Sequence, residues 1–468
     1  MSILEQVYDP EEFRRLGHSL IDMLADHLSL NRSGGRDKVI DYVDPDRNLA
    51  DWDQANPEPL EYFRKLIQNS MHLHHPRYIG HQVCPPAPLA ALAAMEGMFI
   101  NSGGAIYEMS QASSTLERLV IDRLKPYFGF SDGDGIITSG GTLANLTALI
   151  CARNVRAGEN VWQNGQEMQY AFMVSEEAHY CIDRAVRIMG WGDKGIIKVP
   201  VDDNYCIRTD LLAVYYQEAM AKGIEVLGVV GSAPTTSTGK YDDLQALGRF
   251  AADHGLWYHI DAAHGGPAVF SEKYRHLMEG CQLADSITVD AHKMMMVPSL
   301  TTMLFFRESR NSYKTFAQQA DYLWNASAEE WYNYGKRTME CTKIMLSTRI
   351  YALMQHYGID VFGRNIDTCY GLAATFAEKV KTNPGMSLAV MPDSNIVCFR
   401  LNGYPGADAN DLNRKVRQAM LEEGRFYIVQ TVLRGDVWLR ISIMNPMTTS
   451  DDLQALIDHI TDVAKRIY

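Results

Sequence analysis

The chain has 468 residues, of which 46% are hydrophobic and 22% are charged. At roughly 150 residues per domain this length gives about three domain-equivalents, which excludes a peptide or a lone binding module. The composition is near the globular average and excludes a disordered scaffold. With 44 Lys and Arg against 57 Asp and Glu, the formal net charge is −13. This charge argues against a general nucleic-acid or anionic-membrane surface, but not against a small anionic ligand held by local donors.

The eight cysteines are scattered and form no Cys-x-x-Cys pair, so neither a zinc knuckle nor a redox motif is visible. Reduced thiols are the simplest interpretation. The first residues carry acids and no apolar core of a signal peptide, and the most apolar stretch, Pro85 to Ile100, is interrupted by Glu96. We therefore expect no signal peptide, no membrane span and a cytoplasmic location.

The N-terminus predicts an amphipathic helix, with Asp9 as its cap, Pro10 at its first position and Glu12 completing a capping-box pattern. Its apolar face needs a cover, which is either a partner subunit or the body of the same chain. The face is formed by residues three or four apart, namely Phe13, Leu16, Leu20, Leu24 and Leu28.

Short apolar runs alternate with helical patterns from about residue 134 to residue 307. This alternation predicts a mostly parallel sheet covered on both faces, which binds ligands at the carboxyl ends of its strands. The predicted strands are Gly135–Thr138, Ala171–Val174, Gly195–Val201, Val226–Val230, Leu256–Ile260, Ser286–Val289 and Thr301–Phe306.

After about residue 345 the pattern becomes that of a smaller α+β domain. A helical stretch precedes three strands, and a last helix is predicted from about Ser450 to Arg466. The strands are Leu388–Met391, Ile396–Leu401 and Val437–Ile443. We expect an N-terminal arm over residues 1–85, a large domain over 86–345 and a small domain over 346–468.

Two predicted strands lead into residues that can carry chemistry. Asp261 ends one strand and Lys293 lies just past another, so both can meet at the same edge of the sheet. A capping aspartate and a solvated surface lysine are the alternative. The apolar run Met294–Val297 predicts a lowered pKa for Lys293, which would make its amine a usable nucleophile.

The turn Ser139-Gly140-Gly141-Thr142 links a strand to a helix. Its backbone N–H groups, its hydroxyl groups and the helix dipole make it a candidate phosphate cradle, although an ordinary tight turn also explains it. It lacks the lysine of a triphosphate-binding loop. His179 follows the strand Ala171–Val174 and is either structural or a flat ring for stacking. Together, a cradle, an acid, a lysine and a flat ring suit a planar, phosphorylated, aldehyde-bearing pyridine cofactor.

The segment 135–307 resembles the group II pyridoxal-5′-phosphate-dependent amino-acid decarboxylases, the family of the glutamate, cysteine-sulfinate, aromatic-amino-acid, histidine and diaminobutyrate enzymes. The resemblance rests on His259-Ile260-Asp261-Ala262-Ala263, Asp285-Ser286 and His292-Lys293 in this order and spacing. It extends more thinly over nearly the whole chain, through His75-Pro76-Arg77-Tyr78 and the segment 439–446. Many members have Asn-Pro where this chain has Asp290-Ala291, a difference that bears on the subgroup.

The resemblance implies a fold, a cofactor and an assembly. The fold class is α/β, the type I, aspartate aminotransferase-like fold of PLP-dependent transferases, with a mostly parallel seven-stranded sheet, an N-terminal helical arm and a small C-terminal α+β domain. The implied cofactor is pyridoxal 5′-phosphate, and no metal is expected. The implied partners are an amino-acid substrate and a second copy of the chain in a homodimer, without nucleic acid or membrane.

Site roles follow residue by residue from the same resemblance. Lys293 forms a Schiff base with the cofactor, and Asp261 pairs with the pyridine nitrogen. His179 stacks on one face of the ring and Ala263 packs against the other. The remaining cofactor-binding positions are Gly141, Thr142 and His292 at the phosphate and Thr236 near the ring.

The family commonly uses a tyrosine on a mobile loop to protonate the α-carbon. The polar stretch Asn325–Glu330 predicts such a loop, and three tyrosines lie around it: Tyr322, Tyr332 and Tyr334. We expect Tyr332 or Tyr334 to be the proton donor, although each can equally be a packing tyrosine.

Substrate-binding candidates lie at both ends of the chain. Arg440 matches the family position that can meet the substrate carboxylate. The family places the His75-Pro76 region at the substrate mouth, so Tyr78, His81 and Gln82 are candidate specificity residues. Four histidines there lack the spacing of a zinc site; they are His72, His74, His75 and His81.

The leading hypothesis is an L-amino-acid α-decarboxylase, a carboxy-lyase that yields carbon dioxide and a primary amine. The alternatives are an aminotransferase, an aldehyde-forming decarboxylase or a carbon–carbon lyase on the same fold, or an inactive cofactor-binding or interaction protein. Cues to the substrate disagree between acidic (glutamate, aspartate or cysteine sulfinate), diamino (lysine or 2,4-diaminobutyrate) and aromatic amino acids. An acidic substrate is indicated by Trp257 and Met294–Met296. A diamino substrate is indicated by Gly80–Pro86 and Val289-Asp290, and an aromatic one by Tyr78 and Phe99.

Overall fold

The computed structural model describes residues 2–53, 58–157, 160–316, 330–403 and 408–467. The chain divides into two units. The first contains Met1–His81, Leu372–Ala389 and Cys398–Tyr468, and the second contains Gln82–Gly371 and Val390–Val397. The expected boundaries between arm, large domain and small domain remain a prediction.

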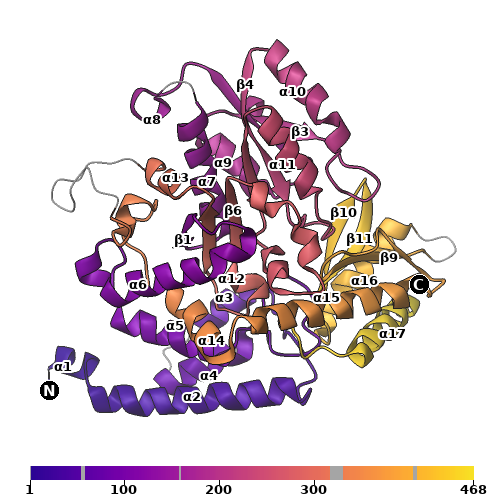
Figure 1. The fold of residues 1–468 in the computed structure, drawn as a ribbon. Coiled ribbons are helices and arrows are strands. Elements are labelled where there is room, and N and C mark those ends of the chain that lie inside the picture. The colour runs from indigo at the N-terminus through magenta and orange to yellow at the C-terminus, as the bar shows by residue number, and fades with distance from the viewer. Residues whose placement is uncertain (1, 54–57, 158–159, 317–329, 404–407, 468) are drawn as a thin grey trace. The chain divides into compact units, whose positions relative to one another are not determined.

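The second unit is built on a seven-stranded sheet with the order β1-β7-β6-β5-β4-β2-β3 (Figure 1). Strand β7 runs antiparallel to both neighbours, and the other neighbouring pairs are parallel. The predicted mostly parallel sheet is therefore confirmed, and each strand overlaps its predicted run. The strands are β1 (Asp134–Thr138), β2 (Gln169–Ser175), β3 (Ile196–Val199), β4 (Ile224–Ser232), β5 (Trp257–Asp261), β6 (Ser286–Asp290) and β7 (Thr302–Phe306).

Helices cover both faces of this sheet, as the side chains of β5 demonstrate. His259 bonds Asn145 on α7 (Gly141–Arg156), whereas the hydroxyl of its neighbour Tyr258 donates to the carbonyl of Leu244 on α11 (Leu244–Asp253). Successive strand residues point to opposite faces, so α7 and α11 lie on opposite sides (Figure 1). The other helices are α5 (Pro88–Ile100), α6 (Tyr107–Leu124), α8 (Val161–Asn164), α9 (Tyr180–Ile188), α10 (Leu212–Ala221), α12 (Ala291–Met294), α13 (Ser309–Lys314), α14 (Ser347–Tyr357) and α15 (Asp360–Lys381), which continues into the first unit.

The core of the second unit explains why its strands read as unbroken apolar runs. Every residue of β1, β6 and β7 is buried, because helices cover both faces of a parallel sheet. Beneath α7 and α9, Phe172 stacks on Trp191 with ring centroids 5.5 Å apart. Burial of each such ring contributes about 2–3 kcal/mol, and this core holds the carboxyl ends of the strands in place.

The first unit contains the N-terminal helices and a four-stranded sheet with the order β10-β11-β9-β8. Asp9 caps α2, accepting from the N–H of Glu11 at 2.9 Å. The reciprocal capping-box bond was predicted wrongly, because the Glu12 side chain pairs with Arg15 instead, at 2.6 Å. The elements are α1 (Ile3–Val7), α2 (Pro10–Arg32), α3 (Pro45–Asp53), α4 (Pro59–Asn69), β8 (Met386–Leu388), β9 (Ile396–Leu401), α16 (Ala409–Glu423), β10 (Val429–Leu433), β11 (Asp436–Ser442) and α17 (Ser450–Ile467).

Strand β10 is absent from the sequence prediction. Only its end residues, Val429 and Leu433, are buried, so it shows no clear apolar alternation. It pairs with β11 through a tight turn in which Arg434 and Gly435 have φ of 52° and 87°. Two consecutive left-handed residues form the turn that suits a two-residue hairpin.

The apolar face of α2 is only partly covered within its own unit. The helix packs on α4, yet Phe13 and Leu24 are 57% and 43% exposed. All eight cysteines lie among the described residues, and none of them is joined in a disulfide bond there. Among the described residues, no helix has the length and apolar character needed to traverse a bilayer.

Candidate active site

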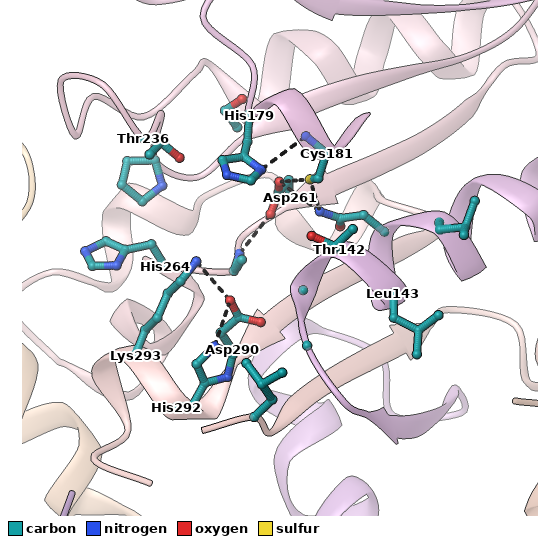
Figure 2. A pocket seen from close by; sticks show the side chains of 18 of the residues that line it. Thr142, Leu143, His179, Cys181, Thr236, Asp261, His264, Asp290, His292 and Lys293 are labelled. Atoms are coloured by element: carbon teal, nitrogen blue, oxygen red, sulfur yellow. Dashed lines mark hydrogen bonds and ion pairs between the residues drawn. The ribbon is translucent and has the colours of Figure 1, made fainter. Parts of the chain in front are cut away.

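A pocket of about 400 Å³ opens at the carboxyl ends of the central strands of the second unit. All of the predicted cofactor-binding positions line it: Gly141, Thr142, His179, Thr236, Asp261, Ala263, His292 and Lys293. Figure 2 shows His179 and Asp261 side by side in one part of the pocket and Lys293 beside Asp290 in another. The strand-end residues are thus brought together as the topology predicts.

Lys293 carries its amine on the one-turn helix α12, directly after β6. Its Nζ lies 2.9 Å from Oδ2 of Asp290, which is buried and also accepts a bond from Thr302 Oγ1 at 2.5 Å. Burial alone would lower the pKa of Lys293, but the Asp290 carboxylate outweighs it and the pKa is raised. The predicted lowering of this pKa was therefore wrong, because Asp290 lies closer to the amine than the neighbouring methionines suggest.

The turn before α7 has the form of an anion cradle. Gly140 has φ of 124°, a backbone conformation that suits glycine, and no side chain caps the first turn of the helix. A Cβ on Gly141 would lie 2.9 Å from Oδ1 of Asp290, so only glycine leaves room between the helix and β6. Backbone N–H groups and the helix dipole are therefore available to a phosphate.

Asp261 accepts hydrogen bonds at both carboxylate oxygens. Asn145 Nδ2 donates to Oδ2 at 2.9 Å, and the N–H of Ala263 donates to Oδ1 at 3.2 Å. The Cys181 Sγ lies 3.9 Å from Oδ2. These contacts fix the orientation of the carboxylate, which suits it to hold a protonated ring nitrogen.

His179 is the N-cap of α9, and its Nδ1 accepts the N–H of Cys181 at 3.3 Å. Burial lowers the pKa of His179. The neutral ring therefore carries its proton on Nε2, and this capping bond fixes the ring at the pocket wall. His179, Cys181 and Asp261 also place ligand-type atoms within 4.8 Å of one another.

His292 lines the same pocket and precedes Lys293 on α12. Its Nδ1 accepts the backbone N–H of Thr301 at 3.2 Å. Its Nε2 lies 3.7 Å from Oδ2 of Asp290. With Nδ1 accepting, the ring carries a proton on Nε2 and can donate it to an anion in the pocket.

These residues fit pyridoxal phosphate. The glycine cradle would hold the phosphate, Asp261 the ring nitrogen, His179 a face of the ring and Lys293 the aldehyde carbon. The fit rests on the donor set and on a cradle that a Cβ at Gly141 would fill.

Three of the four predicted substrate-binding residues lie in the first unit. Tyr78 stacks on Tyr427 with ring centroids 5.9 Å apart, and its hydroxyl donates to the carbonyl of His81 at 3.3 Å. Burial, then Arg440 and Arg417, lowers the pKa of His81, so two guanidinium groups act on this histidine. Burial also lowers the pKa of Arg440.

The fourth predicted residue, Gln82, begins the second unit and does not line the pocket. Its Nε2 is buried and makes no hydrogen bond to any described residue.

Neither candidate tyrosine lines the pocket of its own chain. Tyr334 is 1% exposed, with Lys343 Nζ 4.4 Å and the Arg337 guanidinium 4.9 Å from its ring centroid. Tyr332 is half-buried, and its ring meets Tyr107 edge-on at 5.3 Å. Tyr322 and most of the predicted loop Asn325–Glu330 lie outside the described residues.

The pocket-lining residues that sequence reasoning missed include Asn145, Cys181 and Asp290, whose side chains contact the predicted site residues. Asn145 lies one turn into α7, on the face of Gly141, and helical spacing could have placed it at the site. Cys181 lies two residues past His179. Asp290 was interpreted as a departure from the family pattern and, with Val289, as a cue to a diamino substrate, but not as a residue of the site.

Two solved structures are similar to this chain over nearly its whole length. The mouse CSAD structure aligns with a TM-score of 0.90 at 24% identity, covering 97% of this chain and 99% of that one. The rice TDC structure with PLP and tryptamine aligns with a TM-score of 0.88 at 20% identity, covering 98% and 99%. The fold is therefore that of the PLP-dependent, aspartate aminotransferase-like enzymes, as predicted.

Residues 57–402 match the family model described as the pyridoxal-dependent decarboxylase conserved domain, and the chain belongs to this family. Among its relatives, the L-2,4-diaminobutyrate decarboxylase of Acinetobacter baumannii is 28% identical over 86% of this chain and 82% of its own length. The aromatic-L-amino-acid decarboxylase of Bacillus atrophaeus is 25% identical over 98% and 96%. The chain is thus a carboxy-lyase, a PLP-dependent amino-acid decarboxylase of group II, and its cofactor is pyridoxal 5′-phosphate.

Proposed function

We propose that this enzyme removes the α-carboxylate of an L-amino acid as carbon dioxide and leaves a primary amine, with Lys293 as the residue that holds the cofactor. The observation that carries the proposal is the placement of Lys293, Asp261, His179 and the Gly141 cradle around one pocket. When bound, the cofactor supplies an aldehyde that condenses with amines and a ring that accepts the electron pair left by the departing carboxylate.

The carboxylate of Asp290 controls whether the amine of Lys293 is protonated. The carboxylate keeps the lysine protonated while the amine is free, at a distance of 2.9 Å. The amine must lose that proton before it can act as a nucleophile. Asp290 and the nearby His292 are the buried groups placed to take part in this transfer.

Asp261 and His179 orient the ring. The carboxylate of Asp261 is held by Asn145 and by the N–H of Ala263, so it presents fixed acceptor oxygens to a ring nitrogen. His179 cannot rotate freely, because its Nδ1 is committed to the capping bond. A ring held in one plane would give the groups that bind the substrate carboxylate a fixed reference, so that the bond to the carboxylate could be set perpendicular to the ring.

Of the two predicted proton donors we favour Tyr332. Tyr334 is buried beneath two cations, and its phenol pKa is raised well above the ordinary value, chiefly by burial. Tyr332 is only half-buried, so part of its side chain remains accessible. We take the assembly to be a homodimer, in which such a tyrosine can serve the partner's pocket.

An exposed apolar surface on α5 supports the homodimer. A surface of this kind is unusual on a monomer and typical of an interface. Size-exclusion chromatography with light scattering tests the proposal, and an active monomer at assay concentration would overturn it. The exposed residues are Leu92, Met95, Met98, Phe99 and Ile100.

We infer that Arg440 would meet the carboxylate of the amino-acid substrate and that Tyr78 and His81 would select its side chain. Arg440 and Arg417 both act on the pKa of His81. The relatives act, by name, on diaminobutyrate, on aspartate and on aromatic amino acids. The purified enzyme should be assayed against the twenty amino acids, ornithine, 2,4-diaminobutyrate and cysteine sulfinate, with detection of carbon dioxide, amine, keto acid and aldehyde. Equal amounts of carbon dioxide and amine support the proposal, and a keto acid overturns it.

A second candidate is the aldehyde-forming reaction. The phenylacetaldehyde synthase of Petunia hybrida is 25% identical over 94% of this chain and 92% of its own length. The same assay separates the two reactions, since aldehyde in place of amine would select this one.

A further inference from the structure

A row of buried polar side chains runs through the second unit to Asp261. The indole Nε1 of Trp257 lies 3.0 Å from Ser286 Oγ, and that oxygen lies 2.8 Å from Nδ1 of His259. The Nε2 of His259 lies 2.9 Å from Oδ1 of Asn145, whose Nδ2 donates to Asp261 at 2.9 Å. We call these residues the Trp257–Asp261 relay.

The geometry of the sheet brings the relay together. Trp257, His259 and Asp261 alternate along β5 and share the face that α7 covers. Ser286 is the partner of His259 in the register of β5 and β6. Every relay residue before Asp261 is buried, so water does not complete these bonds.

The chemistry of the two ends fixes the direction of every bond between them. An indole N–H can only donate, so Ser286 Oγ accepts from it and has its own proton to donate to His259 Nδ1. A carboxylate can only accept, so Asn145 turns its NH₂ toward Asp261 and its carbonyl oxygen toward His259. His259 must therefore accept at Nδ1 and donate from Nε2.

His259 is neutral, which the relay requires. Complete burial lowers its pKa to about 4, since a charged imidazole would lose its hydration. The opposite tautomer would set two acceptors, Nε2 and Asn145 Oδ1, against each other. The amide would then turn over and present its oxygen to the Asp261 carboxylate, which is repulsive.

We propose that Trp257, Ser286 and His259 are positioning residues for the cofactor, which hold His259 as its Nε2–H tautomer and thereby keep the Asn145 NH₂ directed at Asp261. The inference rests on the proposed pairing of Asp261 with the ring nitrogen. None of the three lines the pocket. They act only through Asn145, so they touch neither cofactor nor substrate.

The first experiment needs no cofactor. Protein labelled with ¹³C and ¹⁵N on histidine, in its unloaded form, is examined by NMR for the tautomer of His259. The resonance is assigned as the imidazole that vanishes in His259→Gln and does not titrate between pH 5 and 8. The Nε2–H tautomer is expected, and a Nδ1–H tautomer or an imidazolium at pH 7 overturns the relay whatever the role of Asp261 is.

The second experiment measures how the relay acts on the cofactor. His259→Phe removes both ring nitrogens, whereas His259→Gln keeps an N–H near the position of Nε2. We expect the dissociation constant of pyridoxal phosphate, measured by fluorescence quenching of unloaded protein, to rise roughly tenfold or more in His259→Phe and to recover largely in His259→Gln. Equal effects of both variants would overturn the proposal.

The protonation state of the cofactor's ring nitrogen distinguishes a positioning role of the relay from a merely structural one. With ¹⁵N-labelled cofactor, the ring signal should keep its protonated position to higher pH in the parent and in His259→Gln than in His259→Phe. Ser286→Ala, which deletes one bond of the relay, serves where His259→Phe fails to fold. A ring signal that is the same in all folded variants overturns the relay, and a ring that is unprotonated even in the parent overturns the role of Asp261 instead.

Discussion

Asp290 and Lys293 form an ion pair of 2.9 Å at the end of β6, with the carboxylate buried and the amine facing the pocket. The pair raises the pKa of Lys293, while the lysine and His292 outweigh burial and lower the pKa of Asp290. In the enzyme without cofactor, the side chain of Lys293 is therefore a protonated ammonium group.

Asp290→Asn should let the amine of Lys293 lose its proton at lower pH. Without the carboxylate, burial dominates and the pKa of Lys293 falls, so the rate at which unloaded protein captures the cofactor should begin its rise at lower pH. The neutral amide also removes a negative charge from beside the phosphate cradle. Stopped-flow absorbance across pH 6 to 9 measures both effects.

Thr302→Val is the matched control for this variant. It deletes the other hydrogen bond of Asp290 but leaves the charge in place, so the pH profile of cofactor capture should stay close to that of the parent. If Asp290→Asn and Thr302→Val give the same profile, the ion pair does not control the amine.

Acid should destabilise the protein through His259. Its folded pKa is about 4, below the ordinary value of about 6.5, so the unfolded chain takes up the proton first. The stability contributed by the neutral ring is complete above about pH 6.5 and is lost as pH falls toward 4, by about 3 kcal/mol in all. Thermal midpoints from pH 7 to pH 4 should fall less steeply in His259→Gln than in the parent. The exposed His276 supplies the control, since His276→Gln should leave the slope unchanged.

Gly141→Ala should weaken the cofactor without unfolding the protein. The added Cβ would lie 2.9 Å from Oδ1 of Asp290 and must push α7 away from β6 at the cradle. We expect roughly a tenfold loss of affinity for pyridoxal phosphate, which equilibrium titration measures. Gly17→Ala, at a helical position with open space around its Cβ, should bind the cofactor normally. Normal binding by Gly141→Ala would show that the phosphate lies elsewhere.

The sequence predicts the elements that repeat a pattern and misses those that depend on a neighbour. Strands buried on both faces read as apolar runs, so the seven-stranded sheet and the position of Asp261 and Lys293 at its edge follow from periodicity. Strand β10 exists because it pairs with β11, and its exposed middle carries no such signal.

The electrostatics of the site could not be predicted in the same way. The Met294–Val297 run suggested a lowered pKa for Lys293, but the pKa depends on the distance to Asp290, which only the fold sets. The relay could not be predicted from the sequence either, because nothing near Ser286 or Asn145 in the sequence marks them. The register of β5 and β6 and the start of α7 place them beside His259.

One thiol in each chain should react quickly. Cys341 is the exposed cysteine, whereas burial raises the pKa of Cys84, Cys151 and Cys369 to about 12 and leaves them as inert thiols. Titration with a chromogenic disulfide at pH 8 should show one fast equivalent that Cys341→Ser abolishes. A fast phase that survives in Cys341→Ser would come from the partly buried Cys206 or from a buried thiol that becomes accessible in solution.

Tyr332→Phe and Tyr334→Phe should separate catalysis from packing. A proton donor contributes about a hundredfold or more to the chemical step, so Tyr332→Phe should lower kcat by that order with little change in KM. Tyr334→Phe should leave kcat within a few-fold and the thermal midpoint close to that of the parent, because Phe keeps the buried ring over which Arg337 and Lys343 lie. Amine release under steady-state conditions and thermal unfolding measure the two effects. If Tyr334→Phe loses the activity and Tyr332→Phe keeps it, the donor is Tyr334 and its cluster must open during the reaction.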